Sequence, residues 1–172
     1  MQWIDREGRM WWRIENFKVG EAKRSNVIPE ATMIAVWTNH LSVANRAIDS
    51  AHKHIIDEIN RVESLVGAQD VAALMEALGL LENSLCEYFE AEEKIAQAIS
   101  VDFAQHKLAH QRLLKDFHSV KNVLAEKNGK WQDREAGALA IPWAKRFIQH
   151  IKDEGNQMKI VLSTHYYDFQ PD

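Results

Sequence analysis

The chain has 172 residues, of which 46% are hydrophobic and 27% charged, so it is long enough for one globular domain with its own core. Its formal net charge of -4 gives no basic patch for nucleic acid, and its single cysteine, Cys86, excludes an internal disulfide and a cysteine-based zinc site. No apolar run approaches the roughly 20 residues of a membrane span, and no signal-peptide core is present, so we expect a soluble, cytoplasmic protein that binds neither nucleic acid nor membrane.

A tryptophan-rich arm is expected at residues 1–36. Three tryptophans lie in its first twelve residues, and a short hairpin is predicted there with its turn at Glu7 and Gly8. The arm either packs on the body of the protein or contacts a partner protein or a second copy of the chain, because tryptophan is enriched at interfaces.

The rest of the chain is expected to be helical. Only seven glycines and three prolines occur in 172 residues, which favours long helices over turn-dense sheets. Apolar residues alternate in steps of three and four over four segments, at about 45–66, 69–100, 102–128 and 131–163. Pro142 could interrupt the last of them. The predicted fold is all-α: an up-down-up-down antiparallel four-helix bundle over residues 37–165, followed by a polar tail at 166–172.

Seven polar side chains occupy the apolar helix faces, and six of them form pairs at i, i+4 spacing. They are His52 on the first helix, Tyr88 and Glu92 on the second, His106 and His110 on the third, and His150 and Glu154 on the fourth. Each alone has a simpler explanation: a buried histidine with a hydrogen-bond partner, a core tyrosine, or a glutamate paired with a lysine. The free-energy cost of burying all seven without compensation would exceed the net stability of a domain, about 5–15 kcal/mol.

A metal ion would supply that compensation. Imidazole together with carboxylate suits iron, manganese or zinc, and open coordination positions suit redox-active iron. Two carboxylates would allow two metal ions, because each can bridge them and offset their charge.

The chain resembles the bacterial hemerythrins in four motifs that occur in the same order. Residues 37–45 and 48–53 are similar to the first-helix signature W-x-x-x-L-S-V-G-N followed by I-D-x-Q-H-K. Residues 88–93 are similar to H-F-x-x-E-E, residues 106–110 match H-x-x-x-H, and residues 150–151 match the H-I that opens the last ligand motif. The resemblance extends from about residue 33 to residue 162.

This resemblance implies two non-haem irons with an oxo or hydroxo bridge, held by five histidines, a glutamate and an aspartate, and reversible binding of dioxygen at one iron. By position, His106, His110 and His150 would hold one iron and His52 the other, with Glu92 bridging them.

Two positions depart from the family pattern. Gly155 stands where the bridging aspartate is expected, and helical phase favours Glu154 as its replacement, because four residues rotate about 40° past a full turn and five about 140°. Tyr88 stands where a histidine ligand is expected. It either coordinates ferric iron as a phenolate or stays protonated and donates to Glu92 or to a bound ligand, and a weak or empty second site is also open.

The expected function is that of a diiron protein that binds or senses dioxygen or a related small ligand. One alternative is an enzyme, a diiron oxidase or peroxidase or a protein that reacts with nitric oxide, which the change at Tyr88 would favour. Another is a non-redox module that stores iron or holds zinc while the arm recruits a partner.

Overall fold

Four long helices form most of the structure. The computed structural model describes residues 2–4, 10–12, 34–68, 70–127, 130 and 133–171, apart from the side chains of residues 2–4, 10–12, 133–136, 154 and 156. The helices are α1 (Arg46–Ala68), α2 (Val71–Ala98), α3 (Ala104–Lys127) and α4 (Asp133–Leu162). They confirm the prediction of an all-α bundle and lie close to the predicted bounds. Within the described ranges, no helix is apolar over a length that could cross a lipid bilayer.

Two short strands lie in the N-terminal arm. β1 (Gln2–Ile4) pairs with β2 (Met10–Trp12) in antiparallel register, with Trp3 opposite Trp11. This pairing agrees with the hairpin expected from the sequence, whereas the expected turn at Glu7 and Gly8 lies outside the described residues. Contact of the arm with the body, a partner or a second copy stays a prediction.

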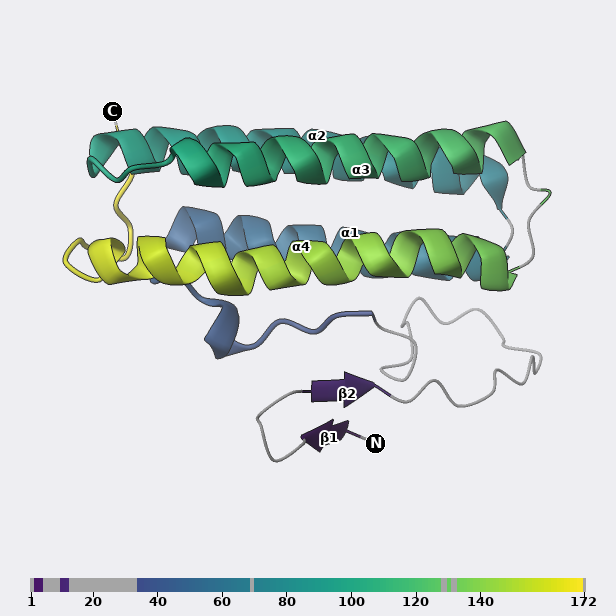
Figure 1. Cartoon of the computed structure of the whole chain (residues 1–172), viewed down its shortest axis with the longest axis horizontal. Helices are drawn as coiled ribbons and strands as arrows, with labels where there is room; N and C mark the ends of the chain where they lie inside the picture. Colours follow the sequence, from purple (N-terminus) through teal and green to yellow (C-terminus); the bar gives the residue numbers. More distant parts are fainter. Residues whose placement is uncertain are drawn as a thin grey trace.

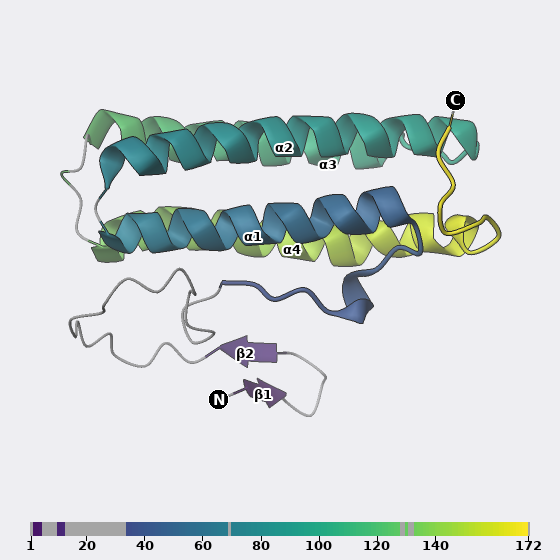
Figure 2. The same ribbon diagram turned by 180° about the vertical axis from the view of Figure 1, so that it is seen from behind.

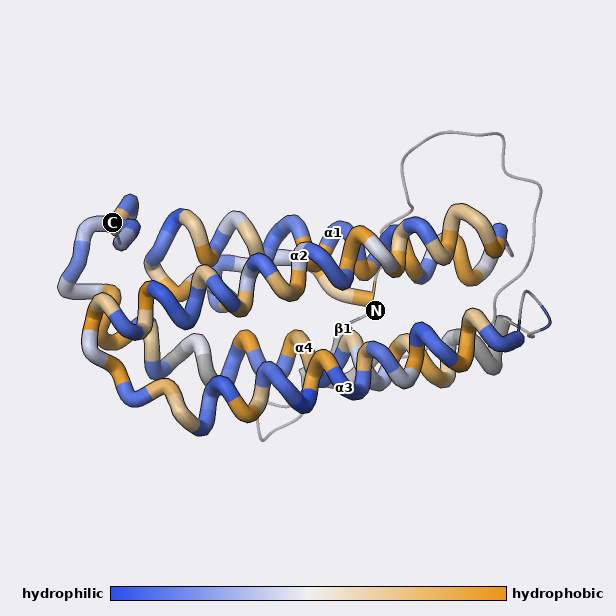
Figure 3. Tube along the Cα trace, turned by 90° about the horizontal axis from the view of Figure 1, so that it is seen from above, coloured by the Kyte–Doolittle hydropathy of each residue, from blue (hydrophilic) through white to orange (hydrophobic). Residues whose placement is uncertain are grey.

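The helices occupy the corners of a square. Figures 1 and 2 show α1 beside α4 and α2 beside α3, and the view from above in Figure 3 shows α1 beside α2 and α3 beside α4. Each helix thus contacts two neighbours. The connections between successive helices alternate between the two ends of the bundle (Figure 1).

The core follows the three-four alternation of the sequence. Hydrophobic and hydrophilic positions alternate along all four helices (Figure 3). Fully buried side chains come from every helix, among them Ile55, Leu85, Phe117 and Phe147. Burial of such side chains is the main stabilising contribution to a bundle of this kind.

Pro142 lies inside α4 and does not interrupt it. The interruption that the sequence allowed is therefore absent. A proline inside a helix costs about 3 kcal/mol, because it removes a backbone hydrogen bond. Trp143 follows directly, is 3% exposed, and donates from Nε1 to the Leu113 carbonyl oxygen at 3.0 Å. Packing of this segment of α4 on α3 offsets the cost.

A segment before α1 is fastened to that helix by two buried side chains. The amide of Asn60 donates to the Ala35 carbonyl oxygen at 2.8 Å, and its Oδ1 accepts from the Ala35 amide at 3.3 Å. Asp49 accepts from the Ser42 hydroxyl at 2.6 Å and from the Val43 amide at 2.9 Å. These bonds place residues 34–45, including the short helix η2 (Asn39–Leu41), against the bundle.

Beside this segment, Glu63 lines a small apolar cavity with Ile34, Ile59 and Leu78 among its neighbours. Burial raises the pKa of Glu63 from 4.5 to about 7, although the Ile34 backbone lowers it. The pKa of Glu63 is higher in the folded chain than in the unfolded chain. The stability that depends on protonated Glu63 is therefore present below pH 4.5 and is lost as the pH rises through 7.

Glu63→Gln is therefore expected to raise the melting temperature at about pH 8 and to leave it nearly unchanged at about pH 5. Thermal unfolding followed by circular dichroism at both pH values measures this. The exposed Glu76, changed to glutamine, is the control and should show no such difference. An equal rise at both pH values for Glu63→Gln would contradict the argument.

Candidate metal centre

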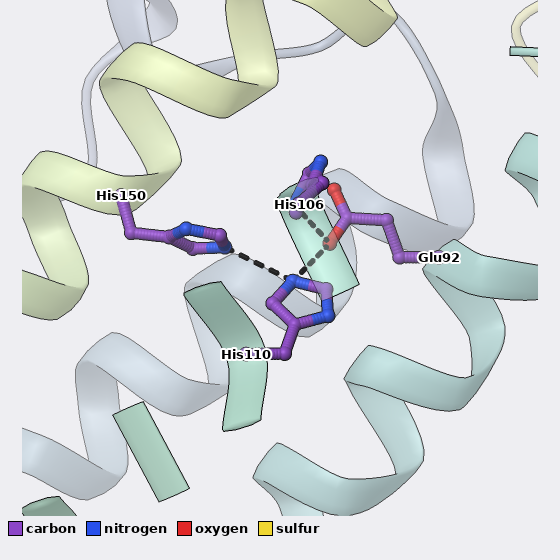
Figure 4. Close-up of side chains that lie close together, drawn as sticks. All are labelled: Glu92, His106, His110 and His150. Atoms are coloured by element: carbon purple, nitrogen blue, oxygen red, sulfur yellow. Dashed lines mark hydrogen bonds and ion pairs between the residues drawn. The ribbon is translucent and has the colours of Figure 1, made fainter. Parts of the chain in front are cut away.

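Four of the predicted site residues converge in the bundle interior. Glu92 on α2, His106 and His110 on α3, and His150 on α4 each offer one donor atom, and these atoms all lie within 4.8 Å of one another. All four side chains are buried. Figure 4 shows them pointing toward a common centre from three helices. We call these four residues the His/Glu cluster.

The spacing of the donor atoms fits a single metal ion. Glu92 Oε2 lies 3.4 Å from His106 Nε2 and 3.2 Å from His110 Nε2, and His110 Nε2 lies 3.1 Å from His150 Nε2 (Figure 4). Donor atoms about 2.1 Å from a shared ion are about 3.0 Å apart in octahedral and about 3.4 Å apart in tetrahedral geometry. These three separations, 3.1 to 3.4 Å, lie within this range, and all four donor atoms lie within 4.8 Å of one another.

The hydrogen bonding of the cluster also fits a metal site. Both carboxylate oxygens of Glu92 and Nε2 of His106 are buried and make no hydrogen bond of good geometry among the described residues. A buried carboxylate without such partners is costly. A cation bound by these atoms would remove that cost, so the residues present fit a metal ion.

The protonation states suit metal binding. Burial, followed by the neighbouring His110, lowers the pKa of His150 from 6.5 to about 3, so its imidazole is neutral at pH 7. Burial alone would raise the pKa of Glu92, but the His106 and His110 imidazoles outweigh it and hold that pKa well below its usual range. Metals bind neutral imidazole and ionised carboxylate. His150 and Glu92 are in these forms at neutral pH.

Two phenylalanine rings pack against the two histidines that α3 contributes to the cluster. The Phe89 ring stacks on His110 with centroids 3.8 Å apart, and Phe103 lies 4.2 Å from the His106 ring. They limit the rotation of both imidazoles and shield them from water. The site prediction did not include these residues, although Phe89 lies within the motif at residues 88–93.

His52 and Tyr88 lie outside the His/Glu cluster and pair with each other. His52 Nε2 is 2.9 Å from the Tyr88 hydroxyl, and both side chains are almost fully buried. Burial lowers the pKa of His52 to about 4, and burial together with the Glu92 charge raises the pKa of Tyr88 well above 10. A neutral imidazole can accept the phenolic proton, so the pair forms an ordinary hydrogen bond. Metal coordination by either residue stays a prediction.

Glu154 and Gly155 on α4 are the two positions considered for the second bridging carboxylate. The side chain of Glu154 lies outside the described residues, so its role as a bridging ligand stays a prediction. Gly155 is buried, and a Cβ added to it would lie 2.9 Å from Val43 Cγ1 in the segment before α1. Val43 is itself only 1% exposed and has little freedom to move. The sequence did not predict this close approach.

Gly155→Ala is therefore expected to lower the free energy of unfolding by about 1–3 kcal/mol, because the new methyl group overlaps Val43. Metal binding should persist, since Gly155 provides no donor. Gly79→Ala is the matched control: no atom lies within 4 Å of the added Cβ, and helix propensity predicts a gain of about 0.5–1 kcal/mol. Urea denaturation measures both, and equal gains in the two variants would refute the overlap.

Other histidines lie at the surface, as the sequence indicated. His54 lies 3.6 Å from Glu58 on the same helix, and His118 pairs with Glu82 across α2 and α3 at 2.6 Å. Both are exposed and neither belongs to the cluster. They provide matched controls for the buried histidines.

The comparisons with known proteins agree with this geometry. A family model described as the hemerythrin HHE cation-binding domain matches residues 43–159, which is more than half of the chain. No curated protein and no solved structure matches the chain. The matched range contains the whole His/Glu cluster together with His52 and Tyr88.

Proposed function

Because the chain belongs to the hemerythrin HHE cation-binding family, we propose that it is a non-haem iron protein that binds or senses dioxygen or a related small ligand in its core. The buried His/Glu cluster carries this proposal. Imidazole–carboxylate sites with open positions are typical of non-haem iron that reacts with oxygen. The alternating connections of the helices support the up-down-up-down antiparallel order that belongs to the proposal (Figure 1).

The residues of the cluster have distinct tasks in this proposal. Glu92 supplies a negative charge that offsets the charge of the cation, and His106, His110 and His150 supply neutral donors. Phe89 stacks on His110 and helps to exclude water. Bound iron would supply the redox and ligand-binding chemistry.

The hemerythrin resemblance extends the proposal to two irons. In that version His52, Tyr88 and Glu154 would hold the second iron, and Glu92 would serve both ions. The resemblance supports this version. Among the described residues, the His/Glu cluster includes neither His52 nor Tyr88, and the Glu154 side chain lies outside the described residues.

The function is tested on the purified full chain, loaded with ferrous iron under argon. We expect a visible absorption band to appear when dioxygen is added and to disappear when argon replaces it. Zinc-loaded protein is the control and should stay colourless. Loading with iron but no spectral response to dioxygen or nitric oxide would contradict binding of small ligands. Failure to bind iron would contradict the whole proposal.

One observation favours an oxidase or peroxidase as a second candidate. Tyr88 places an oxidisable phenol, hydrogen-bonded to His52, next to the Glu92 carboxylate. Rapid, irreversible oxidation of the ferrous protein by dioxygen and turnover with hydrogen peroxide would support the enzyme. A stable, reversible dioxygen adduct would count against it.

A further inference from the structure

We propose that Trp37 is a surface site at which aromatic one-electron donors are oxidised, and that the rings of Tyr88 and His52 connect it to the His/Glu cluster. The inference rests on the second candidate function above, reaction of the iron-loaded chain with hydrogen peroxide. The expected donors are phenols and aromatic amines, which are too large to enter the bundle. Three features carry the inference: a buried metal site, a line of rings in contact, and an end of that line at the surface.

The His/Glu cluster is shielded from large molecules. Its four side chains are at most 8% exposed, and Glu92 is fully buried. The rings of Phe89 and Phe103 pack against its histidines. Hydrogen peroxide is small, but an aromatic donor cannot touch a metal ion held at this depth. Electrons from such a donor therefore have to cross the protein.

A line of aromatic rings runs from the cluster toward the surface. The Tyr88 ring lies 6.0 Å from that of His110, measured between centroids. His52 follows at 4.9 Å from Tyr88, and Trp37 at 6.0 Å from His52. Electron transfer through a protein slows steeply with distance, so the oxidisable rings of Tyr88 and Trp37 divide one long transfer into shorter ones. A metal ion bound by His52 or Tyr88 would leave the order of these rings unchanged.

Trp37 ends this line at the surface. Its side chain is partly exposed, and the Lys53 ammonium lies 5.1 Å from the centroid of its ring. Lys53 is itself exposed, and its positive charge attracts anionic donors. A second branch of rings leads from Tyr88 through Phe147 to Trp143, but Trp143 is only 3% exposed. Of these two tryptophans, Trp37 is therefore the one that a donor in solution reaches.

The electrons and protons balance as in a peroxidase. One hydrogen peroxide accepts two electrons and two protons and becomes two water molecules. Tyr88 gives each electron to the iron centre, and its hydroxyl proton moves to His52 Nε2, 2.9 Å away. That proton returns to Tyr88 when Trp37 reduces the tyrosyl radical. A phenol at the surface then restores Trp37 and releases one proton, so that two phenols become two phenoxyl radicals.

The proposal is tested on the purified full chain in its ferric form, with hydrogen peroxide and the anionic aromatic dye ABTS as the electron donor. Trp37→Phe should lower kcat for ABTS oxidation at least about tenfold, because phenylalanine is not oxidised in its place. Trp143→Phe is the matched control and should keep kcat within about threefold of the wild type. Lys53→Gln should raise KM for ABTS more than it lowers kcat, since Lys53 attracts the donor but passes no electron. Circular dichroism checks that each variant is folded.

A second measurement does not depend on turnover. The ferric protein is treated with hydrogen peroxide in the absence of a donor, and peptide mass spectrometry locates the oxidised side chains. We expect oxidation to concentrate at Trp37, to decrease there in Tyr88→Phe, and to be absent from zinc-loaded protein, because zinc has no redox chemistry. Tyr166 is 91% exposed and reports oxidation by radicals that are free in solution.

Oxidation of Tyr166 to the same extent as Trp37, or ABTS turnover unchanged in Trp37→Phe, would overturn the inference. Iron-loaded protein that binds dioxygen or nitric oxide but does not react with hydrogen peroxide would also overturn it, and would leave the proposed binding function intact. A chain that does not bind iron would refute the proposed function itself, and the inference with it.

Discussion

His110→Ala is expected to abolish metal binding, with an affinity loss of more than about 100-fold. His110 is central in the cluster, because its Nε2 lies 3.2 Å from Glu92 Oε2 and 3.1 Å from His150 Nε2. Its removal takes away one donor and leaves the stacked Phe89 ring without its partner. The remaining donors then lose the neighbour that fixes their positions.

The matched control for this variant is His118→Ala. His118 lies on the same helix but is exposed and pairs with Glu82 rather than with the cluster. Its loss should leave the bound metal unchanged and alter stability little, because surface ion pairs contribute about 0–1 kcal/mol. Metal analysis and anaerobic calorimetric titration measure both variants. Equal metal content in the two would contradict the assignment of the cluster.

Removal of the metal is expected to make the protein acid-sensitive, and this is the second large effect. The pKa values of His52 and His150 fall from 6.5 in the unfolded chain to about 4 and about 3 in the folded one. The unfolded chain therefore takes up protons first. The stability that depends on these two neutral imidazoles is present above pH 6.5 and is lost as the pH falls toward 4 and then 3.

The expected loss is large compared with the whole stability of a small domain. Each pKa unit corresponds to about 1.4 kcal/mol, so two buried histidines lose a sum of several kcal/mol out of a net of about 5–15 kcal/mol. Glu63 acts in the opposite direction between pH 4.5 and 7 and offsets part of this loss, but it is one half-buried group against two buried histidines.

Urea denaturation of the chelator-treated protein at about pH 8, 6 and 5 measures this effect. The midpoint should fall steeply below about pH 6.5. Bound metal should raise the midpoint at every pH at which it stays bound, because it binds only the folded state. His54→Gln, at an exposed position, should not change the pH dependence. A metal-free protein that is equally stable at pH 5 and pH 8 would contradict the buried, neutral histidines.

Much of the fold follows from residue spacing alone. Apolar residues in steps of three and four place the four helices close to their observed bounds, and Gly67 and Ser100 lie near observed helix ends. The effect of Pro142 could not be predicted in the same way. A local penalty competes there with burial of Trp143 on another helix, and only the packed structure decides between them.

The metal site also combines features that residue spacing predicts with features that depend on packing between helices. The H-x-x-x-H spacing sets His106 and His110 on one face of α3 before anything is known of the other helices. Whether Glu92 and His150 reach the same point depends on the depth of α2 and α4 in the bundle. Tyr88 belongs to the interior, as predicted, but its partner depends on distances between helices, and the structure pairs it with His52.

Outside the two predicted ligand positions, Ala44 also differs from the family signature, and the structure places it in a strained backbone conformation. Ala44 stands where the signature has glycine and adopts a φ of 62°, a conformation that favours glycine. The turn is nevertheless kept, because the Val43 amide donates to Asp49 and the Ala44 amide donates to the Ser42 hydroxyl oxygen. A single sequence gives no indication of this strain.

X-ray absorption at the iron edge of the iron-loaded full chain tests the central claim most directly. The account predicts a first shell of nitrogen and oxygen and the outer-shell scattering that is characteristic of about three imidazoles. His110→Ala should remove this signal together with the iron. Iron surrounded by oxygen alone, with no imidazole scattering, would mean that the metal binds elsewhere and that the His/Glu cluster is not the site.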